Sequence, residues 1–82
     1  RWPEFVAAFE NRRPDQSFSI KAPFRDGDAT EFMWLSVTGI ENHVVLGELD
    51  NDPVNVKNVR SGSRVRVPEA EINDWLICDQ LT

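Results

Sequence analysis

The stretch of sequence that decides the fold is residues 30–40, TEFMWLSVTGI. Successive side chains of an extended chain point to opposite faces, so Met33 and Leu35 share one face while Phe32 and Trp34 share the other. A strand that begins apolar on both faces is typical of the middle of a sheet. The pattern therefore predicts that residues 30–40 form the central strand.

The residues before this strand show the same period of two. Apolar residues alternate with polar ones over residues 18–24, and Asp26-Gly27-Asp28 provides a turn signal between the two runs. We therefore expect a hairpin. Pro23 lacks the N–H that a ladder hydrogen bond needs, so its strand is expected to lie at an edge of the sheet or to end there.

Three more strands are expected beyond residue 40, each introduced by a tight turn or by one helical turn. They are residues 43–49 after a turn at Glu41-Asn42, residues 63–67 after a turn at Ser61-Gly62, and residues 75–78 after a helical turn at 68–72. The pattern does not specify the order of the strands in the sheet.

The chain opens with an amphipathic helix, predicted over residues 3–12. Pro3 suits the first helical turn and Pro14 stops the helix. Apolar residues recur at spacings of three, four and seven and form one stripe, which we expect to pack on the sheet. The stripe consists of Trp2, Phe5, Val6 and Phe9.

These elements predict an α+β fold. The helix is followed by a strongly twisted, mainly antiparallel sheet of about five short strands, an arrangement that a partly open small barrel would also satisfy. A chain of 82 residues has room for one core. We therefore expect a single domain over residues 1–82, with its helix at 3–12 and a β region at 17–78.

Segments along most of the β region carry a family resemblance. They are FSIKAPF at 18–24, EFMWLSV at 31–37, GEL at 47–49 with NDP at 51–53, GSRVRV at 62–67 and INDW at 72–75. Together they resemble the YegJ-like bacterial family, domain of unknown function 2314. The resemblance covers residues 17–76 and leaves the helix outside. It implies a compact α+β domain, alone or attached to other bacterial domains, with no established activity and no catalytic residues to carry over.

Charge argues against a general nucleic-acid binder. The formal net charge is -5, which repels a phosphate backbone at long range. One segment differs, because Lys57, Arg60, Arg64 and Arg66 follow one another with no acidic residue between them. Proteins that bind single strands interleave basic residues with aromatic ones, and this segment has no aromatic residue. Nucleic-acid binding through it is therefore the alternative and not the first expectation.

No metal or cofactor site is predicted. The acidic turns at 26–28 and 50–52 lack the further oxygen ligands of a calcium loop, so each is better explained as a solvated turn. Whether the two turns meet in space stays open. His43 has no partner at a spacing that implies a catalytic relay, and Cys78, in an apolar strand, is expected to be a small buried side chain.

The function predicted from the sequence is a non-catalytic protein-interaction or accessory module. The possible partner surface consists of Phe32, Trp34 and Trp75, because tryptophan is enriched at interface hot spots. Whether Trp34 faces the core or a partner stays open. A third alternative, an uncharacterised enzyme, needs a deep pocket lined by His43 or by the acidic turns. With a single cysteine and no apolar run of membrane-spanning length, we expect a cytoplasmic protein without a membrane partner.

Overall fold

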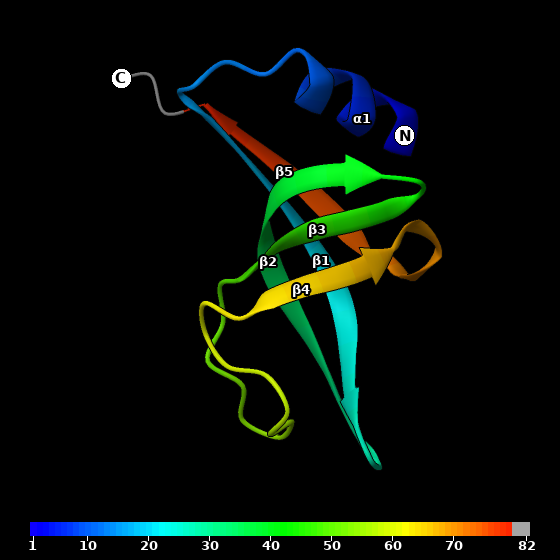
Figure 1. Cartoon of the computed structure of the whole chain (residues 1–82), viewed down its shortest axis with the longest axis vertical. Coiled ribbons are helices and arrows are strands. Elements are labelled where there is room, and N and C mark those ends of the chain that lie inside the picture. The colour runs from blue at the N-terminus through cyan, green and yellow to red at the C-terminus, as the bar shows by residue number, and fades with distance from the viewer. Residues whose placement is uncertain (80–82) are drawn as a thin grey trace.

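The sheet is built around the predicted central strand. The computed structural model describes residues 1–79 and contains one helix, α1 (Trp2–Glu10), and five strands (Figure 1). The strands are β1 (Gln16–Asp26), β2 (Ala29–Glu41), β3 (Val44–Leu49), β4 (Arg64–Pro68) and β5 (Asp74–Asp79), with a 3₁₀ turn, η1 (Glu69–Glu71), before the last. Their order is β4-β3-β2-β1-β5, every neighbouring pair is antiparallel, and the sheet does not close. The α+β prediction is confirmed.

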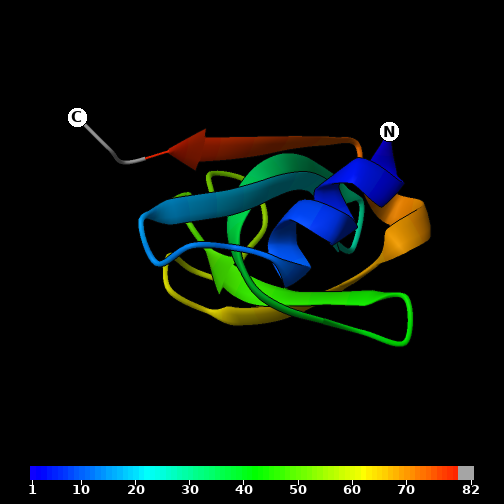
Figure 2. The same ribbon diagram turned by 90° about the horizontal axis from the view of Figure 1, so that it is seen from above.

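The helix covers one face of this curved sheet. Seen from above, α1 lies between β1 and β5 on one side and β3 and β4 on the other (Figure 2). Phe5 and Phe9 are buried, and both rings meet the Phe18 ring of β1 edge to face, at centroid distances of 5.5 and 5.3 Å. Trp2 stacks on Phe5 at 4.8 Å. Trp2, Phe5 and Phe9 of the predicted apolar stripe thus pack on the sheet.

The helix ends at Glu10, two residues earlier than predicted. Side chains from the next two positions take up its last carbonyl groups: the Asn11 amide donates to the Ala7 oxygen at 2.9 Å, and the Arg12 guanidinium donates to the Phe9 oxygen at 2.9 Å. These side-chain bonds add to the backbone N–H groups of Asn11 and Arg12, which donate to the same two carbonyls at 3.2 Å.

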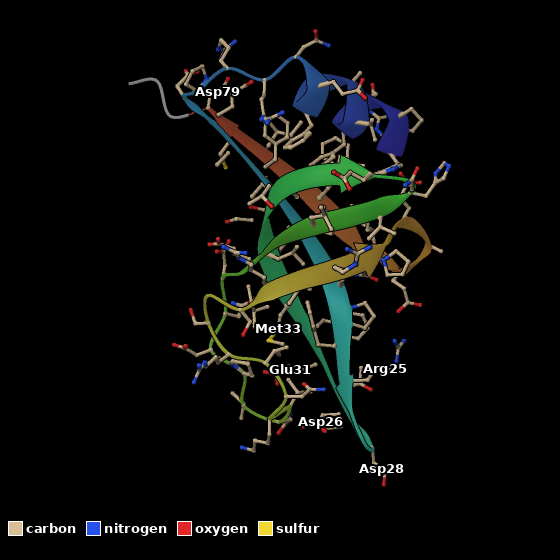
Figure 3. The ribbon with its side chains drawn as sticks, in the orientation of Figure 1. Arg25, Asp26, Asp28, Glu31, Met33 and Asp79 are labelled. Atoms are coloured by element: carbon tan, nitrogen blue, oxygen red, sulfur yellow. The ribbon has the colours of Figure 1, made fainter. Side chains whose placement is uncertain are left out.

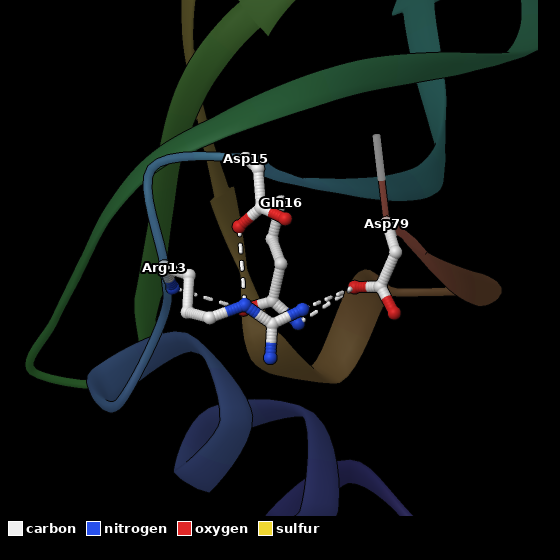
Figure 4. A network of polar contacts seen from close by, with 4 residues as sticks. All are labelled: Arg13, Asp15, Gln16 and Asp79. Atoms are coloured by element: carbon white, nitrogen blue, oxygen red, sulfur yellow. Dashed lines mark hydrogen bonds and ion pairs between the residues drawn. The ribbon is translucent and has the colours of Figure 1, made fainter. Parts of the chain in front are cut away.

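The linker after the helix is fastened to the far end of β5. The Arg13 guanidinium contacts Asp15 at 3.1 Å and Asp79 at 3.2 Å, and the Gln16 amide donates to the same Asp79 oxygen at 2.9 Å (Figure 4). These groups are largely exposed, so each contact adds at most about 1 kcal/mol. Their effect is to set the direction in which the chain enters β1.

Pro23 marks a local edge inside an interior strand. β1 lies between β2 and β5, but β5 pairs with it only from Gln16 to Lys21. Pro23 therefore has β2 on one side and no strand on the other, where its missing N–H is harmless. The strand does not end there, since it continues to Asp26.

The turn between β2 and β3 consists of Asn42 and His43, with φ angles of 51° and 65°. Two consecutive left-handed residues between paired Glu41 and Val44 form the type of turn that matches the twist of a hairpin. Consequently β3 begins at Val44, one residue later than predicted, because His43 cannot be extended and left-handed at once.

The irregular segment between β3 and β4 supplies a second small core. Val56 is buried against Met33 and Leu49, beneath the lower half of the β1–β2 hairpin. Two carboxylates of the hairpin, Glu31 and Asp26, point toward this segment (Figure 3). The Asp26 carboxylate accepts the backbone N–H of Lys57 at 2.7 Å. Loop residues 50–63 are thereby fixed to the sheet without forming a strand of their own.

Candidate interaction surface

The face of the sheet opposite α1 carries a patch of apolar side chains. Phe32 pairs with Pro23, and Trp34 pairs with Lys21, on adjacent strands. Phe32 is 53% exposed and Leu76 of β5 is 49% exposed, while Trp34 is half-buried. We call Pro23, Phe32, Trp34 and Leu76 the outer patch. Trp34 therefore lies on the outer face and not in the core, because it alternates along β2 with buried Met33 and Leu35.

Hydrogen bonds hold the strand that presents the outer patch. The Trp34 N–H donates to the Asn51 side-chain oxygen at 2.5 Å, and the Trp34 carbonyl accepts the Asp50 N–H at 3.0 Å. The Ser36 hydroxyl donates to the Asp50 carboxylate at 2.6 Å. β3 ends before it reaches Trp34, and Asp50 and Asn51 take its place as partners of the Trp34 backbone N–H and carbonyl. The strand β2 therefore stays extended where it carries Trp34.

Trp75 does not belong to the same surface as Phe32 and Trp34. It packs on the helix side, with its ring centroid 5.3 Å from that of Phe5. The predicted three-residue partner surface is therefore divided between opposite faces of the sheet. The last strand is apolar at four consecutive positions, 75–78, so its sequence does not show which positions face the core.

The same ambiguity misplaces Cys78, which is exposed instead of buried. Trp75 and Ile77 pack against the helix-side core. Alternation along β5 then turns Leu76 and Cys78 to the outer face, which nothing covers in the described structure. The prediction of a buried cysteine is wrong for this reason.

The predicted basic surface is divided into two parts. Arg64 and Arg66 are exposed on β4 and line a hollow of about 520 Å³ together with Thr38, Leu46, Glu48 and Val65. Lys57 and Arg60 line a separate hollow of about 350 Å³ in loop 50–63. The Lys57 ammonium donates to the Val54 carbonyl at 3.3 Å, so part of its hydrogen-bonding capacity is used within the loop. The four residues do not form one continuous strip.

The charges on the outer face balance. Strand register places Arg64 opposite Glu48, and Glu48 opposite Ser36, whose side chain bonds Asp50. Lys21 likewise lies opposite Asp74. The basic groups that the register places on this face include Lys21, Arg25, Arg64 and Arg66, and the acidic groups include Glu41, Glu48, Asp50 and Asp74. A phosphate backbone would therefore meet about as much repulsion as attraction here.

The acidic turns are used by the chain itself. Asp26 accepts a backbone N–H of loop 50–63, and Asp50 accepts the Ser36 hydroxyl. Within residues 1–79, no three histidine, cysteine or acidic side chains gather closely enough to hold a metal ion. The same residues contain no helix with the length and apolar character needed to cross a bilayer.

His43 lies at the surface beside one carboxylate. Its side chain is 87% exposed, and Nδ1 is 3.1 Å from Glu69. The indole N–H of Trp2 and then the His43 ring lower the pKa of the Glu69 carboxyl. The Trp2 nitrogen is enclosed in the described structure and makes no hydrogen bond of standard geometry, so the contact with His43 is the firmer of the two. This exposure differs from the sheltered position that a general base usually occupies.

Comparison with known proteins places the whole domain in a bacterial group. A family model described as "Uncharacterized protein conserved in bacteria (DUF2314)" matches residues 3–82. The helix is therefore inside the shared region, and the expectation that it lies outside is wrong. Its buried stripe completes the core of the sheet, which explains why helix and sheet occur together.

Two curated relatives are about one third identical to this chain over the aligned residues. The chain is 33% identical over 66 residues to the uncharacterized protein YegJ of Escherichia coli (strain K12), covering 80% of this chain and 43% of the relative. It is 34% identical over 65 residues to a putative ankyrin repeat protein of Neisseria meningitidis serogroup B, covering 73% of this chain and 26% of the relative. The chain thus spans less than half the length of either. No solved structure gives a significant match.

Proposed function

The chain belongs to the DUF2314 family of uncharacterised proteins conserved in bacteria, and from that premise we propose that it is a non-catalytic protein-interaction module. The outer patch is its binding surface. The observation that carries the proposal is that Phe32, Trp34 and Leu76 share the outer face, with Phe32 and Leu76 largely exposed and with Phe32 and Trp34 on a strand held in place by Asp50 and Asn51.

The outer patch has the properties of an interface centre. Large aromatic side chains contribute most to binding energy when they sit on a rigid support and become desolvated by the partner. Trp34 and Phe32 are on the central strand, whose hydrogen bonds leave it little freedom to rearrange. Binding would then cost little conformational entropy at the interface.

The partner that fits is a protein surface with an apolar centre and charged groups of both signs around it. Charged groups of both signs lie in and around the outer patch: Lys21 is opposite both Trp34 and Asp74, and the rim on the other side carries Arg64 and Glu48. Such an alternating rim pairs with a mixed-charge rim and sets the register of the complex.

Nucleic acid has one observation in its favour. Strand register places Arg64 on the same outer face as Trp34, two strands away, so the fold brings to this face an aromatic residue that the basic segment lacks in sequence. The nearby carboxylates of Glu48 and Asp50 offset that gain, because they oppose a phosphate backbone at the same place. A protein partner therefore remains our proposal.

One relative supports a role as an attached module. The Neisseria meningitidis protein named as a putative ankyrin repeat protein matches this chain over 26% of its length. Ankyrin repeats stack into extended concave binding surfaces. A domain of this family in such a chain is consistent with a function in recognition and not in chemistry. We also propose a cytoplasmic location, because the exposed Cys78 thiol is better preserved in a reducing compartment.

The test compares two variants that remove exposed apolar groups from different places. The patch variant carries both Phe32→Ser and Leu76→Ser, which remove the most exposed side chains of the outer patch. The control variant, Val54→Ser, removes a 71% exposed side chain from loop 50–63. Each tagged protein is incubated with lysate of its source bacterium, and captured proteins are quantified by mass spectrometry. A partner identified in this way is then purified and titrated.

We expect the patch variant to lose the partner and Val54→Ser to keep it, with binding by the patch variant weakened at least about tenfold in the titration. Thermal unfolding confirms that both variants are folded. Equal capture by the patch variant and the wild type would count against the proposal. Capture that disappears on nuclease treatment would support nucleic-acid binding instead.

A further inference from the structure

A small pocket lies beside the start of β5, and one of its lining residues, Asp74, also lies opposite Lys21 at the border of the outer face. It has a volume of about 210 Å³ and is formed where the start of α1 meets the connection from η1 to β5. Two indole rings, two carboxylates, one amide and one aliphatic side chain line it. These side chains are Trp2, Glu69, Ile72, Asn73, Asp74 and Trp75.

We propose that this pocket binds an organic ammonium group. The attraction between a cation and an aromatic face is greatest for tryptophan, and two tryptophans line the same small volume. Glu69 and Asp74 supply negative charge, and no basic side chain is among the lining residues. A pocket with aromatic walls and two carboxylates, and with no basic side chain in its own lining, favours an organic cation over a neutral or anionic ligand.

The negative charge in the pocket is held in place by neighbours. Glu69 contacts the His43 ring at 3.1 Å, and its backbone N–H donates to the His43 carbonyl at 2.9 Å. The Trp2 and His43 side chains lower the pKa of the Glu69 carboxyl and so favour its charged form. The Asp74 carboxylate accepts the backbone N–H of Trp75 at 2.8 Å, which fixes one of its two oxygens.

These contacts also select between kinds of cation. A guanidinium favours two parallel hydrogen bonds to one carboxylate. One oxygen of Glu69 is already occupied by His43, and one oxygen of Asp74 by the backbone. An ammonium acts as a compact point charge and needs no paired oxygens, so it suits this pocket better.

The two indole rings of the pocket are also held in position by contacts with the hydrophobic core. Trp2 stacks on Phe5 at 4.8 Å, and Trp75 lies 5.3 Å from the same ring. Because Phe5 is fully buried, both indoles are held by a rigid support before any ligand arrives. A preorganised pair of rings reduces the entropy lost on binding.

The experiment titrates the protein with choline and with its uncharged carbon isostere, in which carbon replaces the quaternary nitrogen. A Trp34→Phe background leaves Trp2 and Trp75 as the fluorescent reporters, and backbone NMR shifts of Asn73 and Trp75 locate the site. We expect saturable binding of choline and at least about tenfold weaker binding of the isostere. Glu69→Gln and Asp74→Asn should each weaken the binding of choline, whereas Glu4→Gln, an exposed control on α1, should leave it unchanged.

A trimethyllysine peptide identifies the source of the ammonium group. Tighter binding of the peptide than of choline would support the proposal with a protein side chain as ligand, and the reverse order would support it with a small molecule. Equal affinity for choline and the isostere, or wild-type affinity in both Glu69→Gln and Asp74→Asn, would overturn it, as would a titration without saturation.

Discussion

The Glu31 carboxylate accepts the backbone N–H of Asn55 in a hydrogen bond of 2.9 Å that joins positions 24 residues apart. The same carboxylate accepts the N–H groups of Val54 and Val56, at distances of 3.0 to 3.3 Å. Three successive N–H groups directed at one carboxylate form an anion-binding turn that the chain fills with its own side chain. Glu31 thereby fixes a loop that has no ladder hydrogen bonds at these positions.

The first prediction concerns this contact and its pH dependence. The N–H groups of Asn55 and Val54 lower the pKa of the Glu31 carboxyl. A carboxyl whose folded pKa is depressed stabilises the fold above its unfolded pKa of about 4.3, and that contribution is lost as pH falls through the folded value. Glu31→Gln should remove this dependence and speed hydrogen exchange in loop 50–63 at neutral pH. Glu48→Gln, an exposed control, should leave the exchange unchanged.

The second prediction concerns two glycines on neighbouring strands. A Cβ at Gly47 would overlap the Ser36 carbonyl oxygen and lie 2.6 Å from Leu35 Cδ1, whereas a Cβ at Gly39 would meet Leu46 at an ordinary 3.6 Å. Gly47→Ala should therefore cost about 1–3 kcal/mol of unfolding free energy, and Gly39→Ala should be close to neutral. Urea unfolding measures both. Equal destabilisation by the two substitutions would contradict the close approach of β3 to β2.

The third prediction uses adjacent residues on opposite faces of β2. Met33 is 2% exposed and Phe32 is 53% exposed. Met33→Ala should lower the free energy of unfolding by about 2–5 kcal/mol, because it leaves a cavity beside Leu49 and Val56. Phe32→Ala should cost less than about 1 kcal/mol, since its ring is already half in water. A larger loss for Phe32 would reverse our assignment of core and outer faces.

The elements predicted well from sequence are those with a clear period. Residues 30–40 contain apolar side chains on both faces, and that pattern identified the central strand directly. The stripe of α1 did the same for the helix, because Phe5 and Phe9 recur at helical spacing. Helix and strand signals of this kind are local, so no knowledge of the fold is needed to read them.

The residues whose positions were predicted wrongly lie in segments without a clear alternation of apolar and polar residues, or depend on contacts between residues far apart in the sequence. Residues 75–78 are apolar throughout, so alternation did not reveal that Trp75 faces the helix while Cys78 faces outward. The register of distant strands then decides that Arg64 and Trp34 share a face. The Trp2 and Trp75 pocket joins the two ends of the chain, and its signal in sequence was limited to the presence of acids near tryptophan.

The last prediction concerns His43, which holds a φ of 65° in the turn between β2 and β3. A side chain at this backbone conformation costs about 1–2 kcal/mol that glycine avoids, while the exposed contact with Glu69 returns at most about 1 kcal/mol. Asn42 followed by glycine is also the preferred pair for this turn. His43→Gly should therefore raise the free energy of unfolding by up to about 1 kcal/mol at neutral pH, and His43→Ala, which keeps the strain and loses the contact, should lower it. Urea unfolding of the two variants measures the difference, and an alanine variant as stable as the glycine variant would show that the turn is not strained at His43.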